Sequence, residues 1–419
     1  MSHSPIFAPE NRDPFVAKRV KVLSLCMGYF KHDVGKNKQL KRYLLGQYKQ
    51  KHTPTFKDTM SSLISIVPLL SNVYELEIEL WYAPSDVLAP LFQAIHTSFG
   101  KRLDRLLIRA NLDGIWALVG ECAEKFEHLK GLHVELMNRL SPANQRVDVD
   151  ENTLVCSVAP FIKSLAPTLE VLRIWTWASV DFSRFYDVLA TSNFPALKSV
   201  YIRMAFNDML RQPESLQAFL SGCGCTLEKL ELRLNNSRGM QLGQSNEEPL
   251  GKWLEDFVGK ESDTLQHPLS FPKLQALDFY PSTAESGTTA LLSIIHRSAD
   301  TLLELTIRDR YFYPDQARTL ITAAAKCKLR YFRMNVMHLD VELLDLVMEK
   351  LPDLEKIWFS LSKVMGSGEV DLFIQLFSTL TYIYVSIHFI RYYDRENITR
   401  RKFGTSPSGK EVSKWRVKP

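Results

Sequence analysis

A short line of residues, Leu-x-x-Leu-x-apolar, recurs about a dozen times along the chain and limits the folds open to it. Clear copies begin at Leu103 and Leu227. Eight of the eleven separations between first apolar positions are 25 to 30 residues. A fixed period of this size is typical of a repeat array rather than of separate globular domains. The first apolar positions are Val20, Val73, Leu103, Leu129, Leu169, Leu197, Leu227, Leu274, Leu302, Leu329, Leu354 and Leu380.

Each copy predicts a strand that is followed by a helix. Leu230 and Leu232 alternate with charged residues, as in a strand with one buried face. Between Met334 and Leu354, apolar residues recur at steps of three and four, as on one face of a helix. Strand, helix and next strand give parallel strands joined by right-handed crossovers. We therefore predict an α/β solenoid of about 12 parallel strands on its concave face, with helices on its convex face.

The repeats also predict the domain organisation. The solenoid should span residues 18–390, after an irregular lead-in at 1–17 and before a basic, partly disordered tail at 391–419. Insertions in solenoids usually form loops on one face. The long spacings place insertions near 31–55, 141–152 and 235–250.

No catalytic, cofactor-binding or metal-binding motif accompanies the repeats. Gly35-Lys36 lacks the other residues of a phosphate-binding loop. Cys223 and Cys225 have no second pair of Cys or His nearby, as a zinc site requires. We therefore expect a protein that is not an enzyme and has no cofactor and no metal. The sequence contains no run of 18 apolar residues and no apolar signal core, so we expect an intracellular protein, cytoplasmic or nuclear, without a membrane segment.

Alternate strand residues should line the concave wall, and they are rich in arginine and aromatic side chains. Arg, Tyr and Trp are enriched at the energetic centres of protein interfaces. At one end, Glu75, Glu77 and Glu79 are expected to make the wall acidic. An alternative is that these positions bind nothing, because strands favour aromatic residues in any case. The candidate partner-binding residues are Arg173, Trp175, Tyr201, Arg203, Arg233, Tyr280, Arg308, Arg333 and Trp358.

Two interpretations of function remain open. In the first, the concave wall recognises a protein ligand of unknown identity. In the second, basic termini bind a polyanion, either a nucleic acid or an anionic surface. Residues 1–57 hold 12 Lys and Arg against 3 Asp and Glu, and residues 391–419 hold 9 against 3. Because charged tails are commonly only solvated, we favour the protein ligand over the nucleic acid.

Several strand phrases resemble those of a known family. FPALKSVYIR, FPKLQALDF, TLEKLELRL and LPDLEKIWFSL resemble the fungal F-box proteins with a degenerate leucine-rich repeat domain, and the opening VAKRVKVLSLC resembles the start of that domain. The resemblance implies a leucine-rich repeat solenoid shaped as a ribonuclease-inhibitor-like horseshoe. It also implies a substrate-recognition subunit of a ubiquitin ligase. Ligase components would be partners if an F-box lies upstream, since the F-box itself is not visible in this chain.

Overall fold

The computed structural model describes residues 17–26, 56–80, 85–119, 126–137, 147–176, 180–234, 247–259, 271–361 and 382–387. The chain divides into two compact units. The N-terminal unit comprises Met1–Leu227 and Asn236–Gly243. The C-terminal unit comprises Glu228–Asn235 and Gln244–Pro419.

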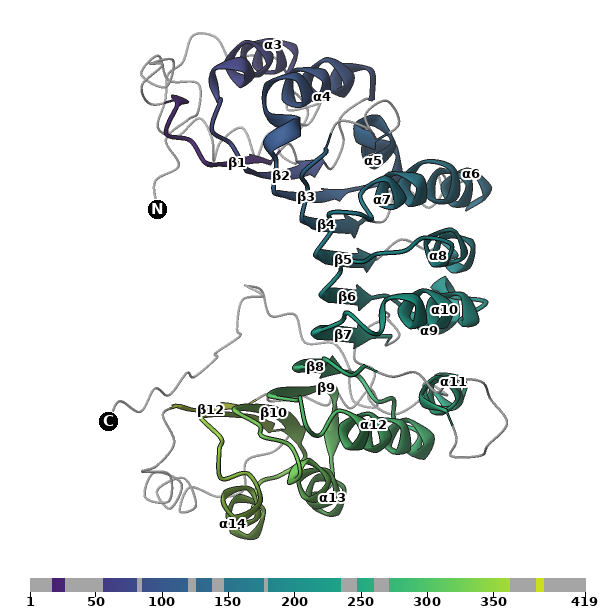
Figure 1. Ribbon diagram of the computed structural model, residues 1–419, viewed down its shortest axis with the longest axis vertical. Coiled ribbons are helices and arrows are strands. Elements are labelled where there is room, and N and C mark those ends of the chain that lie inside the picture. Colours follow the sequence, from purple (N-terminus) through teal and green to yellow (C-terminus); the bar gives the residue numbers. More distant parts are fainter. Residues whose placement is uncertain are drawn as a thin grey trace, which may run out of the picture. The chain divides into compact units, whose positions relative to one another are not determined.

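In the N-terminal unit, the described strands are parallel and pair in chain order. They are β1 (Val22–Cys26), β2 (Glu75–Leu80), β3 (Arg105–Ala110), β4 (Gly131–Leu136), β5 (Val171–Thr176) and β6 (Ser199–Arg203). The described helices of this unit lie on one face of its sheet (Figure 1). They are α3 (Phe56–Ile66), α4 (Ser85–Phe99), α5 (Leu112–Val119), α6 (Val147–Thr153), α7 (Ala159–Ser164), α8 (Ser183–Ala190), α9 (Phe206–Met209) and α10 (Glu214–Cys223).

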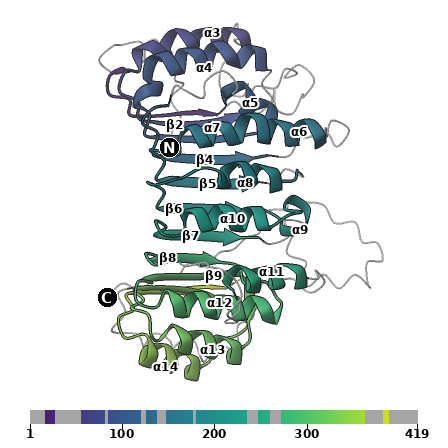
Figure 2. The same cartoon turned by 45° about the vertical axis from the view of Figure 1, so that its right-hand side comes forward.

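The C-terminal unit repeats this arrangement. Its described strands, again parallel, are β7 (Lys229–Arg233), β8 (Ala276–Phe279), β9 (Glu304–Phe312), β10 (Tyr331–Val336), β11 (Lys356–Leu361) and β12 (Tyr382–Ile387). Its described helices lie on one side of the sheet (Figure 2). They are α11 (Glu248–Val258), α12 (Glu285–Arg297), α13 (Pro314–Ala324) and α14 (Val341–Lys350). In each unit we call the opposite side of the sheet the helix-free face.

The repeated leucines form the spine of each unit. Leu106 pairs in register with Leu132, which pairs with Leu172, and all three side chains are buried. Each buried leucine contributes about 1.5–3 kcal/mol relative to an exposed one. On β5, Leu172 and Ile174 face the helices, whereas Arg173 and Trp175 alternate with them and are half-buried. The alternation that buries leucines in the core therefore also places the intervening side chains on the helix-free face.

A backbone contact just before most of the described strands holds the repeats in register. The Asp104 and Arg105 amides both donate to the Tyr74 carbonyl, at 2.8 and 3.1 Å. The same pair of bonds recurs at later repeats of both units. Because this contact fixes how far one strand can slide along the next, side chains of neighbouring repeats meet at fixed positions on the helix-free face.

The structure confirms the predicted α/β class, in which parallel strands alternate with helices as a leucine-rich repeat solenoid. The expected loop at 141–152 is wrong from residue 147 onward, because Val147–Thr153 form α6. Acidic residues favour a helix N-terminus, and Asp150 lies in the first turn of α6. The lead-in before residue 17, the insertion at 31–55, residues 235–246 and the tail lie outside the described residues. None of the described helices is long and apolar enough to cross a bilayer.

Candidate partner-binding face

Four of the predicted residues meet on neighbouring strands of the N-terminal unit. We call them the Arg173 cluster: Arg173 and Trp175 on β5, with Tyr201 and Arg203 on β6. The register places Arg173 beside Tyr201 and Trp175 beside Arg203. Arginine and aromatic side chains therefore alternate both along and across the strands, and all four are half-buried.

The rings of this cluster hold both guanidinium groups. Arg173 Cζ lies 4.3 Å from the Tyr201 ring centroid and 5.2 Å from that of Trp175. Arg203 Cζ lies 5.9 Å from the Trp175 ring centroid. A guanidinium within about 6 Å of an aromatic centroid is attracted to the negative face of the ring. The cluster is thus cationic and is ordered by its own side chains.

His133 on β4 borders the Arg173 cluster but adds no charge to it at neutral pH. Its ring meets the Trp175 ring edge-on, with centroids 4.9 Å apart. Burial, followed by the nearby charges of Arg173 and Arg109, lowers the pKa of His133 to about 4. Three buried atoms have no hydrogen-bond partner among the described residues, namely His133 Nε2, Arg173 Nε and Trp175 Nε1. Such orphaned groups are uncommon and leave hydrogen-bonding capacity for an external group.

Arginines of β3 partly neutralise the acidic end predicted from β2. Arg109 Nη1 lies 3.0 Å from Glu79 Oε2, and Arg109 Nε lies 2.8 Å from Glu135 Oε2. The hydrogen bond that Arg109 donates to Glu135, the strongest of several influences, raises the pKa of Arg109. Arg105 and Glu75 form a longer, more exposed pair at 3.8 Å. The carboxylates of this end are therefore partly matched by arginines of the same face.

Two predicted arginines of the C-terminal unit bind carboxylates of their own unit. Arg233 on β7 binds Asp309 on β9, with 2.5 Å between Nη2 and Oδ2. Arg308 on β9 binds Asp278 on β8, with 2.5 Å between Nη2 and Oδ2. Arg233 is also buried, which differs from the exposed position that the alternation predicts. These two arginines are internally neutralised and are poorly placed to serve as free anchors.

The Asp278 carboxylate lies in a crowded and poorly solvated position. Burial raises the pKa of Asp278 to about 6, and the charge of Arg308 opposes this rise. The neighbouring carboxylates of Glu231 and Asp309 act in the same direction as burial. Asp278 Oδ1 accepts no hydrogen bond from any described residue. The ion pair with Arg308 therefore does not fully offset the free-energy cost of burying the Asp278 charge.

Arg333 and Trp358 form a smaller pair on β10 and β11. Arg333 Cζ lies 4.5 Å from the Trp358 ring centroid, and the register places the two residues side by side. Burial and then the charge of Arg308 lower the pKa of Arg333. Within the described part of the chain, no carboxylate forms an ion pair with Arg333. This pair is the part of the C-terminal helix-free face that most resembles the Arg173 cluster.

Tyr280 differs from its predicted exposed position. It is 5% exposed, and its hydroxyl donates to Glu247 Oε1 at 2.5 Å. Burial and then this hydrogen bond raise the pKa of Tyr280. Glu247 Oε2 also accepts from the Thr283 amide at 2.6 Å. Tyr280 therefore joins two loops of the C-terminal unit, and it lies outside strand β8, which ends at Phe279.

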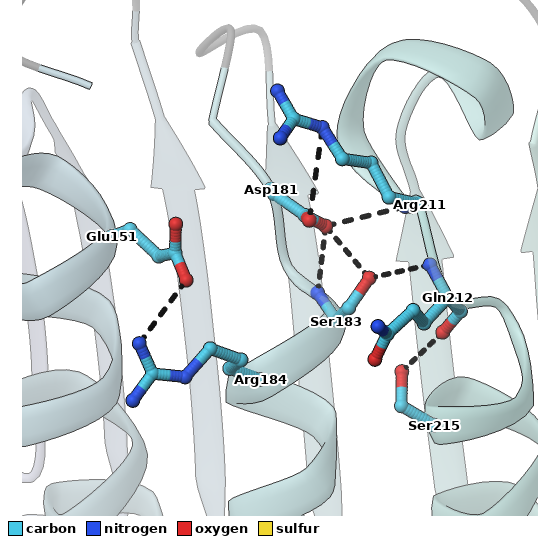
Figure 3. A network of polar contacts seen from close by, with 7 residues as sticks. All are labelled: Glu151, Asp181, Ser183, Arg184, Arg211, Gln212 and Ser215. Carbon is cyan, nitrogen blue, oxygen red and sulfur yellow. Dashed lines mark hydrogen bonds and ion pairs between the residues drawn. The ribbon is translucent and has the colours of Figure 1, made fainter. Parts of the chain in front are cut away.

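A polar network near the loops that follow β5 and β6 escaped the sequence analysis (Figure 3). Asp181 Oδ1 accepts from the Ser183 amide at 3.0 Å, the Ser183 hydroxyl at 2.7 Å and the Arg211 amide at 3.2 Å. The Gln212 amide donates to Ser183 Oγ at 2.8 Å. The Asp-x-Ser spacing is typical of a local side-chain turn and could have indicated it. This network joins two successive repeats, and the Ser183 hydroxyl both donates and accepts a hydrogen bond within it.

The cysteine pair considered above as a zinc site has no geometry for one. Cys223 is buried in α10, and its thiol donates to the Phe219 carbonyl at 3.3 Å. Burial raises the pKa of Cys223 to about 12. Among the described residues, no group of three His, Cys, Asp or Glu side chains is placed to hold a metal ion.

No protein-family model and no curated protein matches the chain. One similar solved structure is the crystal structure of the Rad7 and Elc1 complex in yeast, with a TM-score of 0.44 and 13% identity over 74% of this chain and 69% of that chain. Another is the crystal structure of a TLR13–ssRNA13 complex, with a TM-score of 0.34 and 12% identity over 71% of this chain and 41% of that chain. Likeness at this level does not identify a ligand. The geometry above defines the class: a leucine-rich repeat solenoid with arginine and aromatic clusters on its helix-free face.

Proposed function

We propose that the protein recognises another protein through the helix-free face of its N-terminal unit, with the Arg173 cluster as the anchor. The observation that carries this proposal is the alternation of Arg173, Trp175, Tyr201 and Arg203 across two neighbouring strands. These residue types dominate the energetics of known protein interfaces. Aromatic rings supply contact area, and arginines supply several hydrogen-bond donors each.

The rigidity of the cluster supports the same proposal. Arg173 and Trp175 stand on β5, whose register is fixed by β4 on one side and by β6 on the other. The contacts of the Arg173 guanidinium with the Tyr201 and Trp175 rings limit the rotamers of a side chain that would otherwise be flexible. Binding a partner then costs less conformational entropy than ordering a free arginine would. Arg333 and Trp358 offer a second, smaller contact of the same kind in the C-terminal unit.

Site-specific photocrosslinking in cells tests this proposal. A photoreactive amino acid would replace Tyr201 in one variant and Ala218 in another. Ala218 is an exposed residue on α10, so it serves as a control on the helical side of the same unit. We expect discrete protein adducts from position 201 that disappear in a Trp175→Ala background. The proposal fails if positions 201 and 218 yield the same adducts, or if position 201 yields none.

A finer proposal is that the partner is a ubiquitin-ligase substrate. Its support is the resemblance of the strand phrases to those of F-box proteins with leucine-rich repeats. Affinity purification of the tagged full chain should then recover a cullin and its adaptor together with the crosslinked partner. If the partner is purified without ligase components, the protein recognises a partner but does not act as part of a ubiquitin ligase.

Polyanion binding by the basic termini is the alternative function. Most of residues 1–57 and all of residues 391–419 lie outside the described part of the structure, so its support is the charge of the sequence. Phosphate-driven binding weakens steeply with salt, since counterions are released on association. An affinity for single-stranded RNA that falls steeply with salt and is lost on removal of both termini would favour this alternative.

A further inference from the structure

We propose that the Arg173 cluster binds an extended partner segment carrying two carboxylates two residues apart, an acid-x-acid pattern. This inference rests on the proposed function, because it specifies the partner chemistry for the same face. Four observations lead to it: the local charge balance, the geometry of the two arginines, the orientation imposed by the rings, and the unused hydrogen-bond donors.

Charge balance separates Arg173 from several other arginines of the helix-free faces. Arg109 binds Glu79 and Glu135, and in the other unit Arg233 and Arg308 bind carboxylates of their own unit. Arg173 forms no ion pair with any described carboxylate. The nearest acidic strand neighbour, Glu135, is already bonded to Arg109 at 2.8 Å. The unmatched charge at Arg173 therefore favours an acidic partner.

Spacing indicates how many acids the partner should carry. Arg203 lies one strand away from Arg173 and two residues further along, because Arg173 pairs with Tyr201. With a strand spacing of about 4.8 Å and a rise of about 3.3 Å per residue, the Cα atoms of Arg173 and Arg203 lie about 8 Å apart along this diagonal. Carboxylates at alternate positions of an extended chain lie on one side, about 7 Å apart. One extended segment can therefore reach both arginines at once.

The aromatic neighbours of Arg173 limit the directions from which a partner can reach its guanidinium. Arg173 Cζ lies within cation–π distance of the Tyr201 and Trp175 rings, so two aromatic groups border its guanidinium. A guanidinium with aromatic neighbours still presents N–H groups in its plane, where a carboxylate binds with two parallel hydrogen bonds. Arg173 Nε and Trp175 Nε1 have no acceptor among the described residues. The carboxylate oxygens of a bound acidic segment would supply acceptors for these two N–H groups.

Selection from a random peptide library tests the inference on the full chain. Displayed peptides of about twelve residues would be selected against the immobilised protein at near-physiological salt. The same library would be selected in parallel against Arg173→Gln, Arg203→Gln and Arg105→Gln. Arg105 is the matched control, because it lies on the same face but has its own partner, Glu75. Thermal unfolding of each variant would verify that it is folded.

The expected result is enrichment of peptides with Asp or Glu at alternate positions, lost with Arg173→Gln and Arg203→Gln but kept with Arg105→Gln. A synthetic peptide from the selection should bind either cluster variant about tenfold more weakly than the native protein. Moving its acids to adjacent positions should weaken binding similarly. Arg173→Lys should also weaken binding, because lysine keeps the charge but not the planar donors.

Other outcomes overturn the inference in distinguishable ways. In one such outcome, the enriched peptides lack paired acids and still require Trp175 for binding. That result would show that the partner is not acidic, and it would leave the proposed function standing. Enriched peptides that ignore every substitution on this face, or no enrichment at all, would overturn the inference, and the crosslinking test would then decide the proposed function separately. Tighter, Arg173-dependent binding of a uridine oligonucleotide than of any peptide would replace the acidic peptide with a nucleic acid.

Discussion

Arg233 on β7 binds Asp309 on β9 across the intervening strand β8. Nη2 and Nε of Arg233 lie 2.5 and 3.0 Å from Asp309 Oδ2, and the two side chains are 10% and 18% exposed. Asp309 reaches this position because its φ is 65°, within the part of β9 where the register with β10 shifts. A left-handed backbone costs an L residue about 1–2 kcal/mol. The pair is therefore built on an unfavourable local conformation that it helps to stabilise.

Asp309→Asn should lower the free energy of unfolding by about 3 kcal/mol. Asparagine tolerates the left-handed backbone, so the loss reflects the buried guanidinium that is left without its counter-charge. Urea denaturation followed by tryptophan fluorescence measures the effect. The double variant Arg233→Met/Asp309→Asn should recover most of the loss, because it removes the unpaired charge as well. Equal stability of Asp309→Asn and the native protein would show that the ion pair contributes nothing.

Asp181 should be a stabilising residue of the N-terminal unit. Asp181→Ala removes the acceptor of two backbone amides and one hydroxyl, whose desolvation is then uncompensated. We expect a loss of about 2 kcal/mol in thermal or urea unfolding. Hydrogen exchange at the Ser183 and Arg211 amides should accelerate in the variant. Asp181→Asn keeps an acceptor oxygen and is expected to lose less, so equal effects of the two substitutions would contradict this role.

Gly287, in the first turn of α12, has no room for a side chain. A Cβ there would lie 1.4 Å from the Pro281 carbonyl oxygen and 2.3 Å from Ser282 Oγ. Because a backbone atom blocks the space, Gly287→Ala should destabilise the protein by about 3 kcal/mol or more. Gly222→Ala is the matched control, since nothing lies within 4 Å of its added Cβ. In helix α10 this second substitution should stabilise by up to about 1 kcal/mol, and circular dichroism during heating compares the two.

The leucine period predicted the fold because the same residues that repeat in the sequence also form the buried spine. Leu172 and Ile174 had to face inward, so the positions of Arg173 and Trp175 followed from strand alternation. The same argument placed Tyr201 and Arg203 beside them once parallel strands were assumed. For this reason the Arg173 cluster could be predicted residue by residue, although its binding role remains a proposal.

Alternation could not predict which arginines have internal partners. Arg233 is paired because β9 departs from regular geometry at Asp309, and no periodic pattern indicates a left-handed aspartate. Tyr280 follows the last residue of its strand, where the loop decides its direction, and it bonds to Glu247. The Asp181 network depends on two loops that are 30 residues apart in sequence. Such contacts arise from loop geometry, which apolar periodicity does not encode.

Asp278 should make stability depend on pH in the sense opposite to most paired carboxylates. Burial raises its pKa in the folded state from 3.8 to about 6, so between these values the folded protein binds more protons than the unfolded chain. Stability contributed by Asp278 is therefore fully present below the lower value and is lost as pH rises through about 6. With about 1.4 kcal/mol per pKa unit, the total change is about 3 kcal/mol.

Urea unfolding of the native protein and of Asp278→Asn, at several pH values across this range, isolates the effect from other titrating groups. The stability of the native protein relative to the variant should fall by about 2 kcal/mol from mildly acidic to slightly alkaline solution. Asparagine has nearly the same shape and cannot titrate, so the difference reports Asp278 itself. The opposite slope, with the native protein gaining stability relative to the variant as pH rises, would mean that the ion pair with Arg308 outweighs burial.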